Sequence, residues 1–235
     1  MPSQYEVSIS PISAKGDILS SDGSSRTRFA VGSDGSILSS VSSASSGLGW
    51  STFNASGGSI EMISTTTLTA NASSVTFSNI PTGYTDLKIV CAVRGTTDSD
   101  LFVQINSSTA TQYSFIAVAQ RGTANDPQCI TASGQSSGLL TSGLANYLLR
   151  ANEYSLFTFD ILQYRNTSIH KTFLYQSGWS LSSSSDIIAF GALTWKDTSA
   201  ITSIKLERTL TGAFYGTTGT SGSTFTLYGI KRYGQ

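Results

Sequence analysis

The segment 15–50 most constrains what this chain can fold into, because it is patterned yet holds few side chains that could form a core. Burying so little apolar surface does not offset the conformational entropy lost when a chain becomes ordered. If the segment is ordered, we expect it to share a core with neighbouring copies or to dock on a larger assembly. Its apolar residues are Ile18, Leu19, Phe29, Val31, Ile37, Leu38, Leu48 and Trp50, separated by Gly, Ser and Asp.

The composition of the whole chain favours strands over helices. Only 12% of its 235 residues are charged, about half the usual share. Thr, Val, Ile, Phe and Tyr are plentiful, whereas the residues that favour helices are scarce over most of the chain. We therefore expect an all-β protein.

A boundary near residues 56–59 separates an extended arm, residues 1–55, from a head domain, residues 56–235. In the head, apolar residues alternate in short runs between Gly, Asn, Asp and Ser, and the only helix we expect is a weak one at 142–150. Sequential strands without crossover helices predict an antiparallel, jelly-roll-like β-sandwich. The expected strands are 60–68 paired with 75–77, then 86–94, 101–106, 113–119, 153–164, 170–179, 186–195, 201–208 and 224–231.

Charge and hydropathy argue against several classes of partner. The chain has 14 basic and 14 acidic residues, and its longest basic run is Lys231-Arg232, so we expect no nucleic-acid surface. No run of 18 apolar residues predicts a membrane-spanning helix. The first residues lack the features of a signal peptide, so we expect synthesis in a cytoplasm. Cys91 and Cys129 have no metal-ligand partner at a useful spacing, and we expect no metal or cofactor.

The sequence offers no persuasive catalytic group, so we expect a protein that is not an enzyme. His170 is the only histidine, and nothing places it beside a nucleophile and a carboxylate. Glu153 and Asp160 are seven residues apart on one expected strand, which puts them on opposite faces and argues against a glycosidase pair. Asp98 and Asp100 are too few to indicate a calcium site, and a solvated turn explains them.

Several motifs resemble those of bacteriophage virion surface proteins. The arm carries GDIL at 16–19, VGSDGSIL at 31–38 and SSGLGW at 45–50, in which the matching positions are Gly16, Asp17, Val31, Gly32, Gly35, Leu38, Gly47 and Trp50. The head carries SSVTFSNIPTGYTDLKIVCAVRG at 73–95, ALTWKDTSAITSIKLER at 192–208 and FTLYGIK at 225–231. The resemblance covers nearly the whole chain. It implies a structural protein of the virion that assembles with other virion proteins.

Trimerisation is the expected assembly, because three arms could close a shared apolar axis and a closed ring avoids open polymerisation. We expect Trp50 to close the junction between arm and head. Two roles remain open: a tail fibre or receptor-binding component that contacts a host surface glycan or protein, and a head fibre or capsid decoration protein whose arm clamps capsomers.

Loops at the end of a sandwich commonly carry binding function, and the long polar loop 121–143 and the loop 211–223 are the candidates here. Identical weak sites on three copies would act through avidity. The candidate contacts in these loops are Arg121, Asn125, Gln128 and Tyr215. Aromatic residues that could stack on sugars, or else fill the core, are Tyr147, Tyr154, Tyr164, Tyr175, Trp179 and Trp195.

Overall fold

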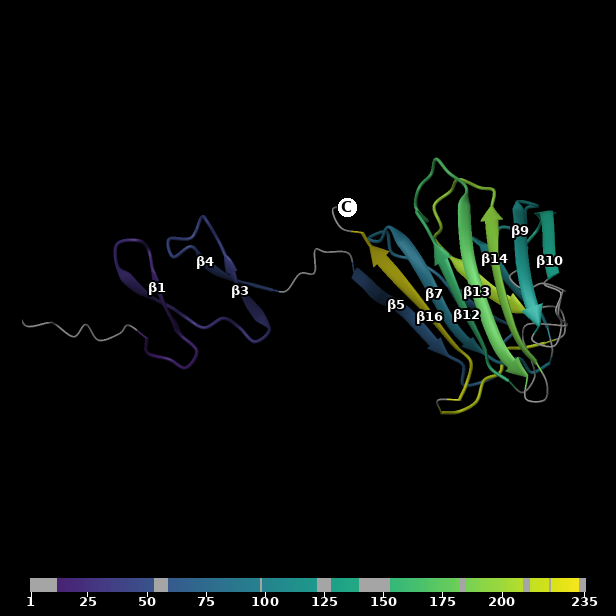
Figure 1. Cartoon of the computed structure of the whole chain (residues 1–235), viewed down its shortest axis with the longest axis horizontal. Helices are drawn as coiled ribbons and strands as arrows, with labels where there is room; N and C mark the ends of the chain where they lie inside the picture. Colours follow the sequence, from purple (N-terminus) through teal and green to yellow (C-terminus); the bar gives the residue numbers. More distant parts are fainter. Residues whose placement is uncertain are drawn as a thin grey trace, which may run out of the picture. The chain divides into compact units, whose positions relative to one another are not determined.

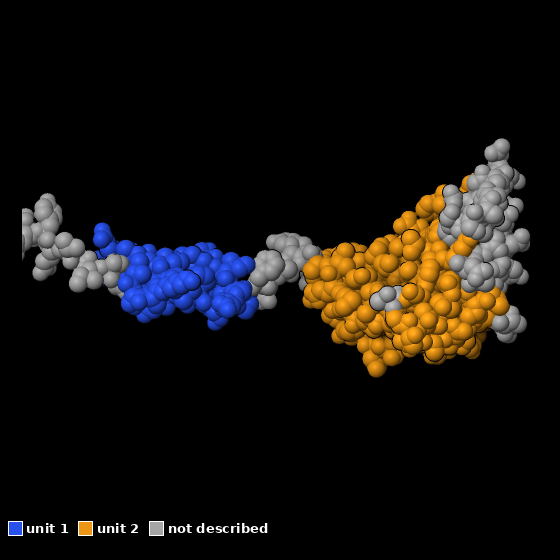
Figure 2. Space-filling view, turned by 90° about the horizontal axis from the view of Figure 1, so that it is seen from below, with its two compact units in different colours: residues 1–55 blue, residues 56–235 orange. Residues whose placement is uncertain are grey.

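The computed structural model forms two compact units, residues 1–55 and residues 56–235 (Figures 1 and 2). All regular elements of its described residues are β-strands, which confirms the all-β class. The expected helix at 142–150 lies outside the described residues, and no helix suited to crossing a membrane occurs among those described. The described residues are 12–52, 59–97, 99–121, 128–139, 153–181, 185–208, 212–219 and 221–232.

The first unit consists of two β-hairpins. Strand β1 (Ile18–Ser21) pairs with β2 (Arg26–Phe29), and β3 (Ser36–Ser40) pairs with β4 (Leu48–Thr52). The sequence ILSS forms the first strand of the first hairpin and recurs in β3, the first strand of the second hairpin, so the first strands of the two hairpins share these four residues. Gly23 in the first turn has a φ of 93°, a conformation that side chains disfavour.

An antiparallel sheet of eight strands forms one layer of the second unit, in the order β10-β9-β14-β13-β12-β7-β16-β5 (Figure 1). Alternation along each strand sends every second side chain inward, as in β7, where Leu87, Ile89, Cys91 and Val93 are buried. The strands are β5 (Ser59–Thr67), β7 (Asp86–Val93), β9 (Tyr113–Arg121), β10 (Gln128–Gln135), β12 (Ser155–Ile161), β13 (Lys171–Leu181), β14 (Ser185–Trp195) and β16 (Thr224–Lys231).

A four-stranded sheet, in the order β11-β8-β15-β6, covers the inner face of the large sheet. Its strands are β6 (Ser74–Phe77), β8 (Leu101–Ile105), β11 (Gly138–Leu139) and β15 (Ile204–Arg208). One continuous apolar core fills the space between the sheets, to which Phe159 and Trp195 contribute from the large sheet and Val103 and Leu206 from the small one. The expected antiparallel sandwich is therefore confirmed.

Two details of the expected sheet are wrong. Strands β5 and β6 do not pair with each other: β5 pairs with β16 and β6 with β15, so the two strands lie in different sheets. Apolar alternation identifies a strand but not its partner, and neighbours in sequence can separate into two layers.

The expected long loop 121–143 also contains two strands, β10 and β11. Among the described side chains of β10, only Ile130 and Ala132 pack against the core, and the outward Cys129 and Thr131 are small. The alternation of β10 is thus too weak to be visible in the sequence.

Candidate functional site

The apolar residues of the first unit stay accessible in the single chain. None of the described residues 12–52 is buried. Val31 is 53% exposed and Ile37 44%. Leu19 and Leu38 are also exposed, whereas Ile18, Phe29, Leu48 and Trp50 are half-buried. The unit therefore presents apolar surface that a single copy does not cover.

Trp50 joins the two hairpins of the first unit, and its expected place at the junction between arm and head stays a prediction. Its ring stacks on Phe29 with centroids 5.7 Å apart, and its indole nitrogen donates to the Ala30 carbonyl at 2.7 Å. A Cβ atom at Gly32 would lie 2.5 Å from the Trp50 ring. The bare glycine thus admits the indole, which explains why a glycine stands at position 32.

Asp17 ties together the start and the end of the first hairpin. Its carboxylate accepts from Arg28 Nε at 2.6 Å and from the backbone N–H of Ala14 at 2.7 Å. The backbone N–H of Ser13, at 3.1 Å, and that of Val31, at 3.4 Å, also donate to it. The hydrogen bond from Arg28, followed by those from the backbone, holds the pKa of Asp17 well below its ordinary value.

The structure places Tyr215 away from the strand ends at which Arg121 and Gln128 lie. Arg121 ends β9 and Gln128 begins β10, with side chains outside the described residues, as is the whole of Asn125. Tyr215 lies beside Arg94, whose guanidinium carbon is 3.4 Å from the ring centroid. Arg94 directly follows β7, four strands away from β9 in the sheet, which corresponds to about 19 Å.

Most of the described aromatic candidates belong to the core. Tyr164, Tyr175 and Trp195 are buried, so they cannot stack on a sugar. Tyr154 is exposed, whereas Tyr147 and the Trp179 side chain lie outside the described residues. For these three buried residues the core interpretation is correct.

The residues weighed for catalysis are scattered. His170 is exposed in the turn before β13, and Glu153 lies just before β12 rather than in it, so the shared-strand argument with Asp160 does not apply. Among the described residues no three His, Cys, Asp or Glu side chains could together hold a metal ion. Cys91 is buried and Cys129 is exposed, both as free thiols.

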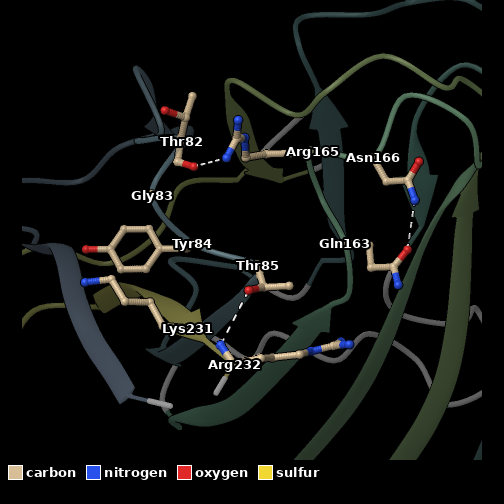
Figure 3. A pocket seen from close by; sticks show the side chains of 9 residues that line it. All are labelled: Thr82, Gly83, Tyr84, Thr85, Gln163, Arg165, Asn166, Lys231 and Arg232. Carbon is tan, nitrogen blue, oxygen red and sulfur yellow. Dashed lines mark hydrogen bonds between the residues drawn. The ribbon is translucent and has the colours of Figure 1, made fainter. Parts of the chain in front are cut away.

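A polar pocket that the sequence did not reveal lies where three chain segments meet at one end of the large sheet. Strands β7, β12 and β16 are antiparallel neighbours, so the start of β7 lies beside the ends of the other two. The segments 82–85, 163–166 and 231–232 therefore surround one hollow of about 620 Å³ (Figure 3). We call it the end pocket; its lining residues are Thr82, Gly83, Tyr84, Thr85, Gln163, Arg165, Asn166, Lys231 and Arg232.

Two carboxylates, those of Asp86 and Glu61, hold residues of the end pocket in place. Asp86 is 3% exposed and accepts from Arg232 Nε and from the backbone N–H of Gln163, each at 2.7 Å. Glu61 accepts from Lys231 Nζ at 2.7 Å and from the Tyr84 hydroxyl at 3.1 Å. The hydrogen bond with Lys231 is the main reason why the pKa of Glu61 is lowered, and the same bond raises the pKa of Lys231.

The buried ammonium group of Lys171 holds the loop that carries Asn166. Lys171 Nζ donates to the carbonyls of Asn166, Ile169 and Thr198. Burial lowers the pKa of Lys171, while the three carbonyl oxygens satisfy its donors. Lys171 therefore holds the loop beside the end pocket in place through these three hydrogen bonds.

The outer face of the large sheet carries a second unusual surface. Five neighbouring strands, from β7 to β9, expose large apolar side chains there, and a groove of about 590 Å³ lies among them. Leu156, Ile188 and Phe190 line the groove beside Gly178, which adds no side chain. Further apolar residues exposed on this face are Val90, Ile116, Val118 and Leu174.

Comparison with known proteins adds no relative from which a role could be transferred. The chain matches no family model, and no curated protein and no solved structure is significantly similar to it. Function must therefore be inferred from its own residues.

Proposed function

We propose that this chain is a structural protein of a bacteriophage virion, a homotrimeric tail fibre or receptor-binding component that contacts the host surface. The observation that carries the proposal is the first unit, in which no described residue is buried although it is regularly folded into hairpins. A unit of this kind gains a core by packing against copies of itself or against other proteins. The motifs that resemble those of bacteriophage virion surface proteins are the reason for proposing a virion as the assembly.

The head domain supports a role at the surface of a particle. It has its own apolar core between two sheets, so it can fold without help from the first unit. Its polar end pocket and its exposed apolar face both offer binding surface. Three copies of such a head would bind a host surface with an avidity that one copy lacks.

A head fibre or capsid decoration protein is the second candidate. The exposed apolar residues of the first unit, among them Val31 and Leu38, would serve to clamp capsomers as well as to form a trimer. In that role the first unit is the working part, and the head is a knob on the capsid.

Locating the chain on the intact virion by cryo-electron microscopy, supported by gold-labelled antibody, tests the proposal. Copies at the tail periphery are the expected result, together with inhibition of host adsorption by the purified protein. Copies at capsomer junctions would establish the second candidate instead. Absence from the particle would refute both.

Light scattering on the purified full chain tests the trimer. We expect a mass three times that of the 24.8 kDa chain. The double variant Val31→Asp, Leu38→Asp should lower this mass, because it places charge on the exposed apolar positions. The control Ser33→Asp adds charge at an exposed polar position of the same unit and should leave the mass unchanged.

A further inference from the structure

We propose that the end pocket binds an acidic saccharide, with the sugar carboxylate placed against Arg165. The inference rests on the proposed function only in that a host surface would supply the saccharide. Its physical basis is the set of charges and polar groups in the pocket, together with the contacts that hold the pocket in shape.

The charges of the pocket favour one negative charge on the ligand. Lys231 and Arg232 are each paired with a carboxylate, Glu61 and Asp86. Arg165 makes no ion pair within the described part of the chain, and its guanidinium donates only to the Thr82 carbonyl. Its remaining donors are free to bind a carboxylate in the fork geometry that guanidinium groups favour. Three cations against two carboxylates leave a single positive charge, which matches a carboxylate better than a phosphate dianion.

The size and lining of the pocket favour a sugar over a small free anion. A hollow of about 620 Å³ falls within the range of small-molecule sites, roughly 300–1,000 Å³. The Thr82 hydroxyl and the side-chain nitrogen of Gln163 have no hydrogen-bond partner among the described residues, so both can bind sugar hydroxyls. Tyr84 adds an aromatic ring at the side of the hollow (Figure 3).

The pocket is held in shape by contacts beneath it. Asp86 fixes both Arg232 and the backbone of Gln163, a residue with a φ of 49°. The Tyr164 hydroxyl donates to the Pro81 carbonyl, which ties the turn after β12 to the segment before Thr82. When a ligand binds to a site organised in this way, little conformational entropy is lost, because the side chains and loops are already ordered.

Ligand-observed NMR on the purified full-length protein tests the inference. Glucuronate, galacturonate and N-acetylneuraminate are the acidic probes; glucose and galactose are their neutral counterparts, and inorganic phosphate tests for a plain anion site. We expect at least one acidic sugar to bind at least tenfold more tightly than the neutral sugars and phosphate. Equal binding of phosphate, equal binding of neutral sugars, or no binding of any acidic sugar would overturn the proposal.

Arg165→Gln should weaken binding of the acidic sugar at least tenfold, because the substitution removes the unpaired charge. Arg165 is exposed and bonds only one carbonyl, so the variant should fold, which circular dichroism can verify. The matched control Arg26→Gln removes an exposed arginine from β2 in the other unit and should leave binding unchanged. Equal affinity of the Arg165 variant and the native protein would contradict the assignment.

The two proposals can fail separately. If the chain lies away from the virion surface and the purified protein still binds acidic sugars, only the proposed function falls. If the chain lies on the tail and no acidic sugar binds, only the ligand assignment falls.

Discussion

Arg208 is a buried cation that organises loops around the small sheet. Its side chain ends β15 on the core side at 7% exposure and donates to Ser99, Thr97 and Ala213. Truncating it would leave those acceptors unsatisfied and create a void. We expect Arg208→Ala to lower the free energy of unfolding by about 3 kcal/mol, measured by chemical denaturation of the full chain.

The control for this variant lies on the same strand. Lys205 pairs with Glu207 near the surface, so Lys205→Ala should cost less than about 1 kcal/mol. Similar losses of unfolding free energy in the two variants would show that Arg208 stabilises the fold no more than a surface ion pair does.

Asp17 makes the first unit sensitive to acid. Its pKa is lowered in the folded unit from an ordinary value of 3.8, mainly by Arg28. The stabilisation is therefore complete above about pH 5 and is lost as the pH falls below the ordinary pKa and through the lowered one. We expect the folded signal of Trp50 in 19F NMR of fluorotryptophan-labelled protein to fade in strong acid.

Asp17→Asn provides the comparison for this pH dependence. The variant should weaken the Trp50 signal already at neutral pH and flatten its change between pH 4 and pH 2. Trp50→Phe assigns the resonance. An unchanged acid profile in Asp17→Asn would mean that another group controls the unit.

At the scale of elements, strand alternation gives the two cysteines opposite environments. Cys91 points into the core from β7, and burial raises the pKa of its thiol far above the ordinary value. Cys129 is exposed on the edge strand β10. We expect a thiol reagent to modify Cys129 rapidly in the native protein and Cys91 only after unfolding, since the thiolate is the reactive form. Cys129→Ser should abolish the rapid phase, and rapid reaction of both thiols in the native chain would contradict this arrangement.

The sequence predicted individual strands well where large apolar residues recur at every second position. Strand β16 has the expected bounds, and β7 differs from expectation by one residue, because large side chains mark the inner face of both. Strand β10 escaped notice because few of its residues face the core, Ile130 and Ala132 among the described side chains. The end pocket could not be foreseen, since it depends on the pairing of β7 with β12 and β16, which sequence alternation does not specify.

At the scale of the whole molecule, the outer face of the large sheet combines five strands into one apolar surface. We expect the native protein to bind the dye ANS in the groove beside Phe190 and Leu156. The double variant Leu156→Ser, Phe190→Ser should reduce the bound fluorescence by at least half. Ile60→Ser is the control, because Ile60 is 64% exposed on the edge strand β5 but does not line the groove. Equal reductions in both would show that the dye does not recognise the groove.

Because no residue is buried in the described part of the first unit, this unit should become stably folded later than the head. A ribosome makes this unit before the head, yet the head has a core and can close as soon as its strands are complete. The hairpins must wait for partners, whose arrival depends on the concentration of finished chains. The first unit, although it is synthesised first, is therefore expected to become resistant to a protease after the head does. The time between the two events should shorten as the concentration of the protein rises.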